Sequence, residues 1–146
     1  MSKNKDNKIE TSGLENQVGH LLRRVFHKAR NRMQVKISDM GLSPMQTAAM
    51  TSLGIKGPTS QNKLGRRIGM EPGNVHGLVD RLLKKGMITS NYIEDGPGLH
   101  ILDLTEQGRD IVDKVIPLGA EANKETLAPL SSKEQEKFME YLRRLL

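Results

Sequence analysis

A mainly α-helical fold with one small β-hairpin is predicted by three observations. Apolar residues recur at spacings of three and four over most of the chain, which is the helical period. Serine or threonine precedes several of these periodic segments, and glycine follows several of them, as is typical of helix ends. Between residues 87 and 104 the pattern changes to short β-favouring runs on either side of the turn sequence Asp95-Gly96-Pro97-Gly98.

Two short helices joined by a tight turn are predicted between residues 59 and 86. Ser60 is placed to cap the first helix with its hydroxyl, and Gly69 ends that helix. Pro72 then begins the second helix at the position where its missing N–H costs nothing. The apolar stripe of the second helix consists of Val75, Leu78, Val79, Leu82 and Leu83.

This arrangement is the plan of a helix-turn-helix. Residues 59–86 carry six Lys or Arg side chains and only two acids. DNA binding and an ordinary surface helix pair with a solvated charged face both fit that pattern. The hairpin that directly follows makes the DNA-binding interpretation more specific, because a helix-turn-helix followed by a hairpin is a winged helix. We therefore predict a winged helix-turn-helix core over residues 42–104.

Further helices are predicted on both sides of this core. Residues 14–40 have one continuous apolar stripe, and Gly41 ends it. Thr105 caps a helix that Pro117 is expected to bend or shorten. Ser131 opens the last helix with a capping box, in which a serine and a glutamate bond to each other's backbone N–H groups.

The first and last helices have apolar faces larger than a small winged core can cover. Large exposed apolar surfaces usually mark an interface. We therefore interpret residues 14–41 and 105–146 as the dimerisation helices of a two-fold homodimer. The polar residues 1–13 are expected to be a disordered tail.

Composition narrows the classes of function. The 146-residue chain has a formal net charge of +6, which favours a polyanionic partner. It contains no cysteine, which excludes disulfides, thiolate metal sites and cysteine nucleophiles. His20 and His27 lie seven residues apart, too far along one helix to share a metal, and we expect neither a metal site nor a cofactor. No apolar run approaches the roughly 18 residues of a membrane span, so we expect a cytoplasmic protein without a membrane partner.

Several segments of the chain are similar to the MarR family of transcriptional regulators, over residues 14–146. The matching segments are LSPMQTAAMTSLGIKGP, TSQNKLGRRIGM, GLVDRLLKKGMI, LDLTEQGRDIV and LSSKEQEKFMEYLRRLL. Their order and spacing together are more specific than any one of them. The resemblance implies a winged-helix homodimer that binds a pseudo-palindromic operator. It also implies, as in many members, a small anionic or aromatic effector that weakens DNA affinity.

The resemblance further implies which residues meet DNA, with Pro72 to Lys85 as the recognition helix. Base or nearby phosphate contacts are expected from Gly73, Asn74, His76 and Gly77, and phosphate contacts from Ser60, Gln61 and Asn62. Asn74 and His76 offer paired donors and acceptors to base edges, whereas Lys84 and Lys85 suit phosphate. Arg81 serves either phosphate or an intramolecular ion pair, and both interpretations remain open.

The wing departs from the family pattern. Members commonly carry Asp-x-Arg there, with the Arg entering the minor groove, but this chain has Gly96-Pro97-Gly98 after Glu94 and Asp95. Because the minor groove is strongly negative and attracts Arg, we expect this wing to contribute little, with His100 as its nearest donor. The alternative is that Pro97 rigidifies the loop so that backbone N–H groups bind phosphate.

An effector pocket is implied where the first, second and fifth helices meet. Its expected lining includes some of Phe26, Arg30, Met33, Met45 and Met50. Methionine side chains adapt to irregular ligands, and Arg30 would pair with a carboxylate. The methionines would equally serve to fill a core in which aromatic residues are only 3% of the chain.

The leading hypothesis is a ligand-responsive, sequence-specific DNA-binding transcriptional regulator, with repression as its expected output. The alternative is a winged-helix protein-interaction module with weak or no operator binding, and the altered wing is its main support. An enzyme is not expected, because the four histidines are scattered and no group of residues forms a catalytic constellation.

Overall fold

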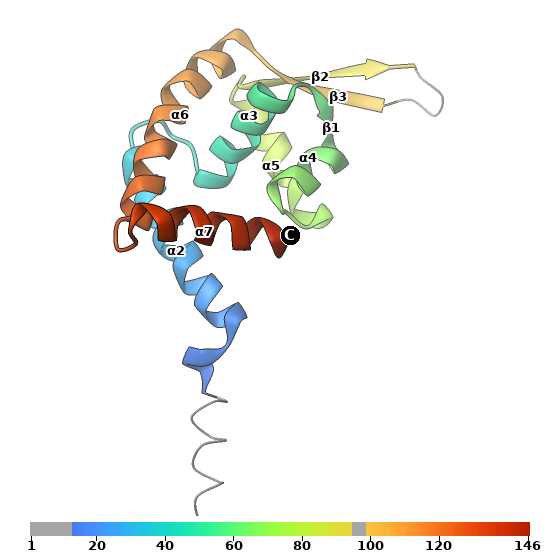
Figure 1. Ribbon diagram of the computed structural model, residues 1–146. Coiled ribbons are helices and arrows are strands. Elements are labelled where there is room, and N and C mark those ends of the chain that lie inside the picture. The colour runs from blue at the N-terminus through green and yellow to red at the C-terminus, as the bar shows by residue number, and fades with distance from the viewer. Residues whose placement is uncertain (1–12, 95–98) are drawn as a thin grey trace, which may run out of the picture. The chain divides into compact units, whose positions relative to one another are not determined.

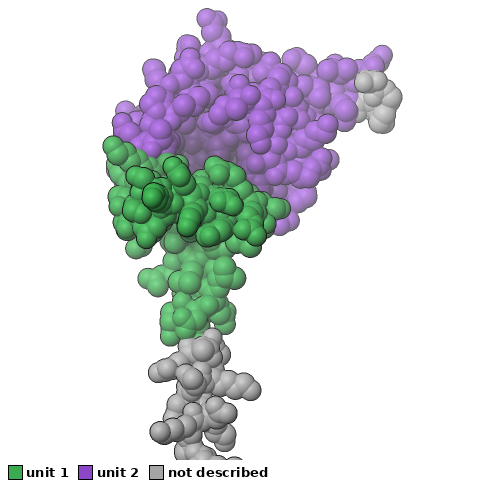
Figure 2. All heavy atoms as spheres, viewed as in Figure 1, with its two compact units in different colours: residues 1–32, 122–146 green, residues 33–121 purple. Residues whose placement is uncertain are grey.

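The computed structural model describes residues 13–94 and 99–146, and its elements divide between two units (Figure 1, Figure 2). The first unit combines the two ends of the chain, residues 1–32 and 122–146, and the second comprises residues 33–121. Of the predicted tail only Gly13 is described, and the predicted turn at residues 95–98 lies outside the described residues.

The prediction of a mainly helical chain with a small sheet is confirmed. The helices are η1 (Leu14–Asn16), α2 (Val18–Lys36), α3 (Pro44–Lys56), α4 (Gln61–Ile68), α5 (Pro72–Lys84), α6 (Glu106–Leu127) and α7 (Ser132–Arg144). The strands are β1 (Thr59–Ser60), β2 (Ile88–Ile93) and β3 (Leu99–Leu104). Helices α2 and α6 each run from one unit into the other.

The sheet of the second unit is antiparallel, with strand order β1-β3-β2. The predicted hairpin is confirmed, and its register pairs Ile88 with Leu104 and Ile93 with Leu99. The sequence analysis missed β1, in which Ser60 pairs with Ile101. A strand of two residues has no alternation from which it could be recognised.

One apolar core holds α3, α4, α5 and the sheet together, and Figure 1 shows these helices clustered next to the strands. Its fully buried members include Met50, Leu53, Leu64, Val75, Leu78, Leu82, Ile88 and Leu102. Gly65 allows the two helices of the helix-turn-helix to pack closely, since a Cβ at that position would lie 2.6 Å from Cγ2 of Val75.

The helix ends largely follow local sequence. The capping box at Ser43 and the position of Pro72 at the start of α5 are confirmed, and Gly69 and Gly86 adopt the expected left-handed backbone, with φ of 67° and 70°. The prediction that the hydroxyl of Ser60 caps α4 is wrong. Ser60 occupies the capping position without a side-chain cap bond and belongs to β1 instead.

Two predicted helix lengths also need correction. Helix α2 ends at Lys36 rather than at residue 40, and Ile37 is wholly buried in the turn that follows. Burial of Ile37 explains its place in the apolar stripe without requiring a helix there. Pro117 lies inside α6 and does not shorten it.

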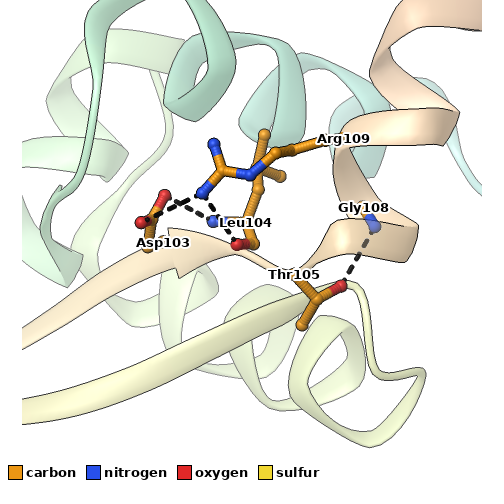
Figure 3. A network of polar contacts seen from close by, with 5 residues as sticks. All are labelled: Asp103, Leu104, Thr105, Gly108 and Arg109. Atoms are coloured by element: carbon orange, nitrogen blue, oxygen red, sulfur yellow. Dashed lines mark hydrogen bonds and ion pairs between the residues drawn. The ribbon is translucent and has the colours of Figure 1, made fainter.

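A polar network joins β3 to α6 (Figure 3). The Thr105 hydroxyl accepts from the Gly108 N–H at 3.0 Å, which confirms the predicted cap, and donates to the Gly86 carbonyl at 2.7 Å. The Arg109 guanidinium reaches the Asp103 carboxylate and the Leu104 carbonyl, both at 3.3 Å. These bonds fix the direction in which α6 leaves the sheet.

The first unit is built from η1, most of α2, the end of α6 and α7. The predicted capping box at Ser131 is confirmed, and its hydrogen bonds to Glu134 lower the pKa of that carboxyl. The Gln135 amide donates to the carbonyls of Leu127 and Leu130, which closes the turn between α6 and α7. Neither α2 nor α7 contains a buried residue.

We predict that Gly108→Ala destabilises the second unit. A Cβ at Gly108 would lie 2.1 Å from the Met87 carbonyl oxygen, so the junction between β2 and α6 would have to shift. The free energy of unfolding should fall by about 3 kcal/mol, measured by urea denaturation. Gly119→Ala is the matched control on the same helix, since nothing lies within 4 Å of a Cβ there. Equal stability of the two variants would contradict this packing.

Candidate nucleic-acid interface

Helix α5 divides cleanly into a buried face and an exposed face. Val75, Leu78, Val79 and Leu82 are buried as predicted, whereas Leu83, which was expected in the same stripe, is 36% exposed. Gly73, Asn74 and His76 are exposed near the start of the helix, and Arg81 is exposed further along. The side chains predicted to meet DNA therefore point away from the core that holds the helix.

Two glycines on this helix are not required by the fold. Neither Gly73 nor Gly77 has a positive φ. Nothing lies within 4 Å of a Cβ at Gly73, and at Gly77 such an atom would meet only the flexible end of Arg81, 3.3 Å away. Glycine in a helix interior costs roughly 0.5–1 kcal/mol relative to alanine. A surface that needs another molecule's backbone to approach closely accounts for glycine at both places.

The start of α4 presents polar groups next to a helix N-terminus. Ser60 and Gln61 are half-buried and Asn62 is exposed. Since no side chain caps α4, the N–H groups of its first turn remain available to an anion. Phosphate binding at this point would use the backbone as much as the three side chains.

The cations at the end of α5 are not equivalent. Lys84 pairs with Asp80 at 2.9 Å, and this hydrogen bond and the lysine charge lower the pKa of Asp80. The Lys85 ammonium donates to the Gly41 carbonyl and so joins the end of α5 to the chain before α3. Arg81 forms no ion pair within residues 13–94 and 99–146, which leaves its guanidinium for another partner.

A groove of about 220 Å³ separates α5 from the hairpin, and His76 and His100 both line it. His100 lies 3.4 Å from the Ser90 hydroxyl, and its ring is 5.3 Å from that of Tyr92. Sequence reasoning missed Ser90, which lines the same groove, and Tyr92, which the hairpin register pairs with His100. The wing residues 95–98 lie outside the described residues.

The residues predicted for an effector pocket fall on both units. Met33 lines a cavity of about 500 Å³ in the second unit, formed mainly by α3 and α6. Met50 is buried in the core and Met45 packs against it. In the first unit Phe26 lines a smaller groove of about 350 Å³, and Arg30 is exposed on α2. That these five residues line one effector pocket remains a prediction.

Within the described part of the chain, no cluster of three His, Cys, Asp or Glu side chains is arranged to hold a metal. None of the helices there is long and apolar enough to cross a membrane.

Comparison with known proteins gives consistent matches. The model of the MarR family matches residues 40–105. The transcriptional repressor NicR of Pseudomonas putida is 26% identical over 133 residues, which cover 89% of this chain and 82% of NicR. A solved structure of a probable transcriptional regulator from Pseudomonas aeruginosa is 36% identical, covers 92% of this chain and 100% of that one, and superimposes with a TM-score of 0.81.

A further similar structure is that of BpsR from Bordetella bronchiseptica, whose DNA binding is regulated by 6-hydroxynicotinic acid. It is 24% identical, covers 91% of this chain and 95% of BpsR, and has a TM-score of 0.82. At that identity the likeness concerns the fold, and it agrees with the winged arrangement of α3, α4, α5 and the hairpin.

We predict that Gly73→Ala separates stability from DNA affinity. Alanine fits the helix without a contact, so the free energy of unfolding should stay the same or rise by up to about 1 kcal/mol. The added methyl group should keep a DNA backbone at a distance, and DNA affinity should fall in a fluorescence-anisotropy titration. A variant that is more stable and binds DNA as well as the parent would remove the functional explanation for this glycine.

Proposed function

The chain belongs to the MarR family of transcriptional regulators, and we propose that it binds a pseudo-palindromic DNA operator as a homodimer and represses transcription until a small molecule releases it. The exposed face of α5 carries this proposal. It offers Asn74 and His76 as hydrogen-bonding groups beside two glycines for which the fold has no use. Such a helix enters the major groove with its N-terminal residues at the base edges.

Groups near that helix that are suited to phosphate support the proposal. The uncapped start of α4 offers backbone N–H groups together with Gln61 and Asn62. Arg81 supplies a guanidinium without an intramolecular ion pair among the described residues, and His100 lines the groove on the side of the hairpin. Affinity would then come from these groups, and sequence preference from Asn74 and His76.

The homodimer is supported by apolar surface that the first unit leaves uncovered. Neither α2 nor α7 buries a residue within one chain. Side chains that are 42% to 71% exposed include Val18, Leu21, Val25, Tyr141 and Leu145. A two-fold partner that covers this surface would give the assembly two recognition helices, one for each half of a palindrome.

The effector is supported by the 500 Å³ cavity of the second unit. Its volume falls in the range of small-molecule sites, and its lining is mostly apolar with a few polar groups. Arg67 and Lys56 are its two cations and no acid lines it, which favours an anion. NicR is named a repressor, and BpsR responds to 6-hydroxynicotinic acid, so we infer a small aromatic acid as the effector, acting in the cytoplasm.

The competing function is a protein-interaction module without operator binding. It is favoured by the absence of any cation in residues 95–98, where family members commonly carry arginine. Titration against the DNA upstream of the chain's own gene, at several salt concentrations, separates the two functions. Operator binding predicts tighter binding to that DNA than to scrambled DNA, whereas the competing function predicts equal and weak binding.

We predict that Asn74→Ala and Lys84→Ala affect DNA binding differently. Asn74→Ala should reduce the preference for operator over scrambled DNA by about 1–3 kcal/mol per half-site, because a base contact is lost. Lys84→Ala removes a cation and leaves the Asp80 carboxylate without its partner. The added negative charge repels phosphate whatever the base sequence, so binding to both DNAs should weaken about equally. Anisotropy titrations with both DNAs measure the ratio. An unchanged ratio for Asn74→Ala would show that sequence is read elsewhere.

We predict that Leu21→Glu combined with Val25→Glu yields a monomer. The two charges would have to be buried without partners in a dimer that uses the exposed stripe of α2. Size-exclusion chromatography with light scattering at micromolar concentration should show a dimer for the parent and a monomer for the variant. Asn31→Glu, on an exposed polar position of the same helix, is the control and should remain dimeric. A dimeric double variant would place the interface elsewhere.

A further inference from the structure

We propose that Arg67 is the residue that both recognises the acid group of the effector and transmits its presence to the DNA-binding surface. This inference rests on the proposed function, since it concerns the 500 Å³ cavity of the second unit. Two observations carry it: the position of Arg67 on the cavity wall and its bond to a backbone carbonyl.

The cavity wall is set by helical spacing. Ala48, Ser52 and Ile55 of α3 lie four and three residues apart and therefore on one face, which lines the cavity. Val115 and Ile116 line it from α6. The last turn of α4 contributes its two final side chains, Arg67 and Ile68, so the first helix of the helix-turn-helix forms part of the wall.

The apolar part of the wall suits the ring of an aromatic ligand. Ser52 also lines the cavity, but its hydroxyl oxygen is buried without a hydrogen-bond partner and is closed to solvent, so a ligand in the cavity would not reach it. Recognition of an acid group therefore falls to the cations of the wall.

Arg67 makes a bond that a ligand could replace. Its Nη1 donates to the Gly57 carbonyl at 2.9 Å, the one hydrogen bond of this guanidinium in the described residues. Arginine has five N–H donors in a planar fork that matches a carboxylate. A carboxylate in the cavity would therefore bind the guanidinium in two-point fashion and draw it away from Gly57.

The bond to Gly57 matters for DNA because of where Gly57 lies. It ends α3 with a φ of 84° and begins the short segment that leads through β1 to Ser60 and Gln61, at the start of α4. Arg67 thus ties the end of α4 to the chain that positions its beginning. When a carboxylate takes the guanidinium, that segment loses its tie, and the phosphate contacts at Ser60 and Gln61 weaken.

Recognition is tested by isothermal titration with 6-hydroxynicotinate, its neutral amide and nicotinate. The parent should bind the carboxylate at least ten times more tightly than the amide. Arg67→Met should abolish this preference, and Arg67→Lys should keep part of it. Lys114→Met, which removes an exposed cation of α6 that does not line the cavity, is the matched control and should keep it.

Coupling is tested by operator anisotropy with and without saturating 6-hydroxynicotinate. The parent should lose at least tenfold in affinity when the probe is added. Arg67→Met without the probe should already bind operator as weakly as the saturated parent and should not respond further. Lys114→Met should respond like the parent.

Every other outcome contradicts recognition, coupling or the proposed function. A carboxylate preference that survives in Arg67→Met overturns recognition; if that variant does not fold, a preference in Arg67→Lys equal to that of the parent does so. Loss of that preference with operator affinity equal to the ligand-free parent overturns coupling. A parent that binds operator but none of the probes overturns this inference and leaves DNA binding standing, whereas a parent that binds no operator overturns the proposed function itself.

Discussion

The burial of one face of α5 is the constraint on which the rest of the structure depends. Val75, Leu78 and Leu82 are almost wholly excluded from water, and they fix the rotation of the helix about its axis. Because helical side chains repeat every 3.6 residues, that rotation leaves Gly73, Asn74, His76 and Arg81 exposed on the opposite face. Gly65 leaves room for the Val75 side chain, because a Cβ there would lie 2.6 Å from Cγ2 of Val75, so α4 and α5 pack closely at this point.

The second structural theme is the use of cations to satisfy backbone carbonyls where elements end. Lys85 donates to Gly41, Arg67 to Gly57 and Arg109 to Leu104, each joining two parts of the second unit that the chain separates. A basic chain therefore has fewer cations for a nucleic acid than its composition suggests. The number of Lys and Arg residues does not show which cations stabilise the fold and which are available to a partner. Their hydrogen bonds do.

These ties bear on how an effector would act. Cavity-lining residues and DNA-facing residues share α4, which has only eight residues from Gln61 to Ile68. A rigid helix of that length moves as one body, so a change at its last turn reaches its first turn without a long chain of contacts. The physical basis of the proposed linkage is therefore the shortness of one helix and the bond that closes the segment before it.

Much of the fold and part of the candidate site were predictable because their causes are local. Caps such as Ser43, Thr105 and Ser131 act within three residues, and the turn at Gly69 needs a φ that glycine adopts readily. Strand β1, the buried turn at Ile37 and the uncapped Ser60 were not predictable. Each depends on what a distant segment places beside it, as β3 does for Ser60.

The sequence by itself determined the order of the helices and the hairpin and the residues on the exposed face of α5, because periodicity and caps depend on neighbouring residues. It also determined that the chain belongs to a family of regulators. Only the tertiary structure decided which cations bond to distant carbonyls: Lys85 to that of Gly41 and Arg67 to that of Gly57. It also decided that the Ser52 hydroxyl is buried without a partner. The reason is physical: a hydrogen bond between segments 10 or 44 residues apart depends on how they pack, and no local pattern records it.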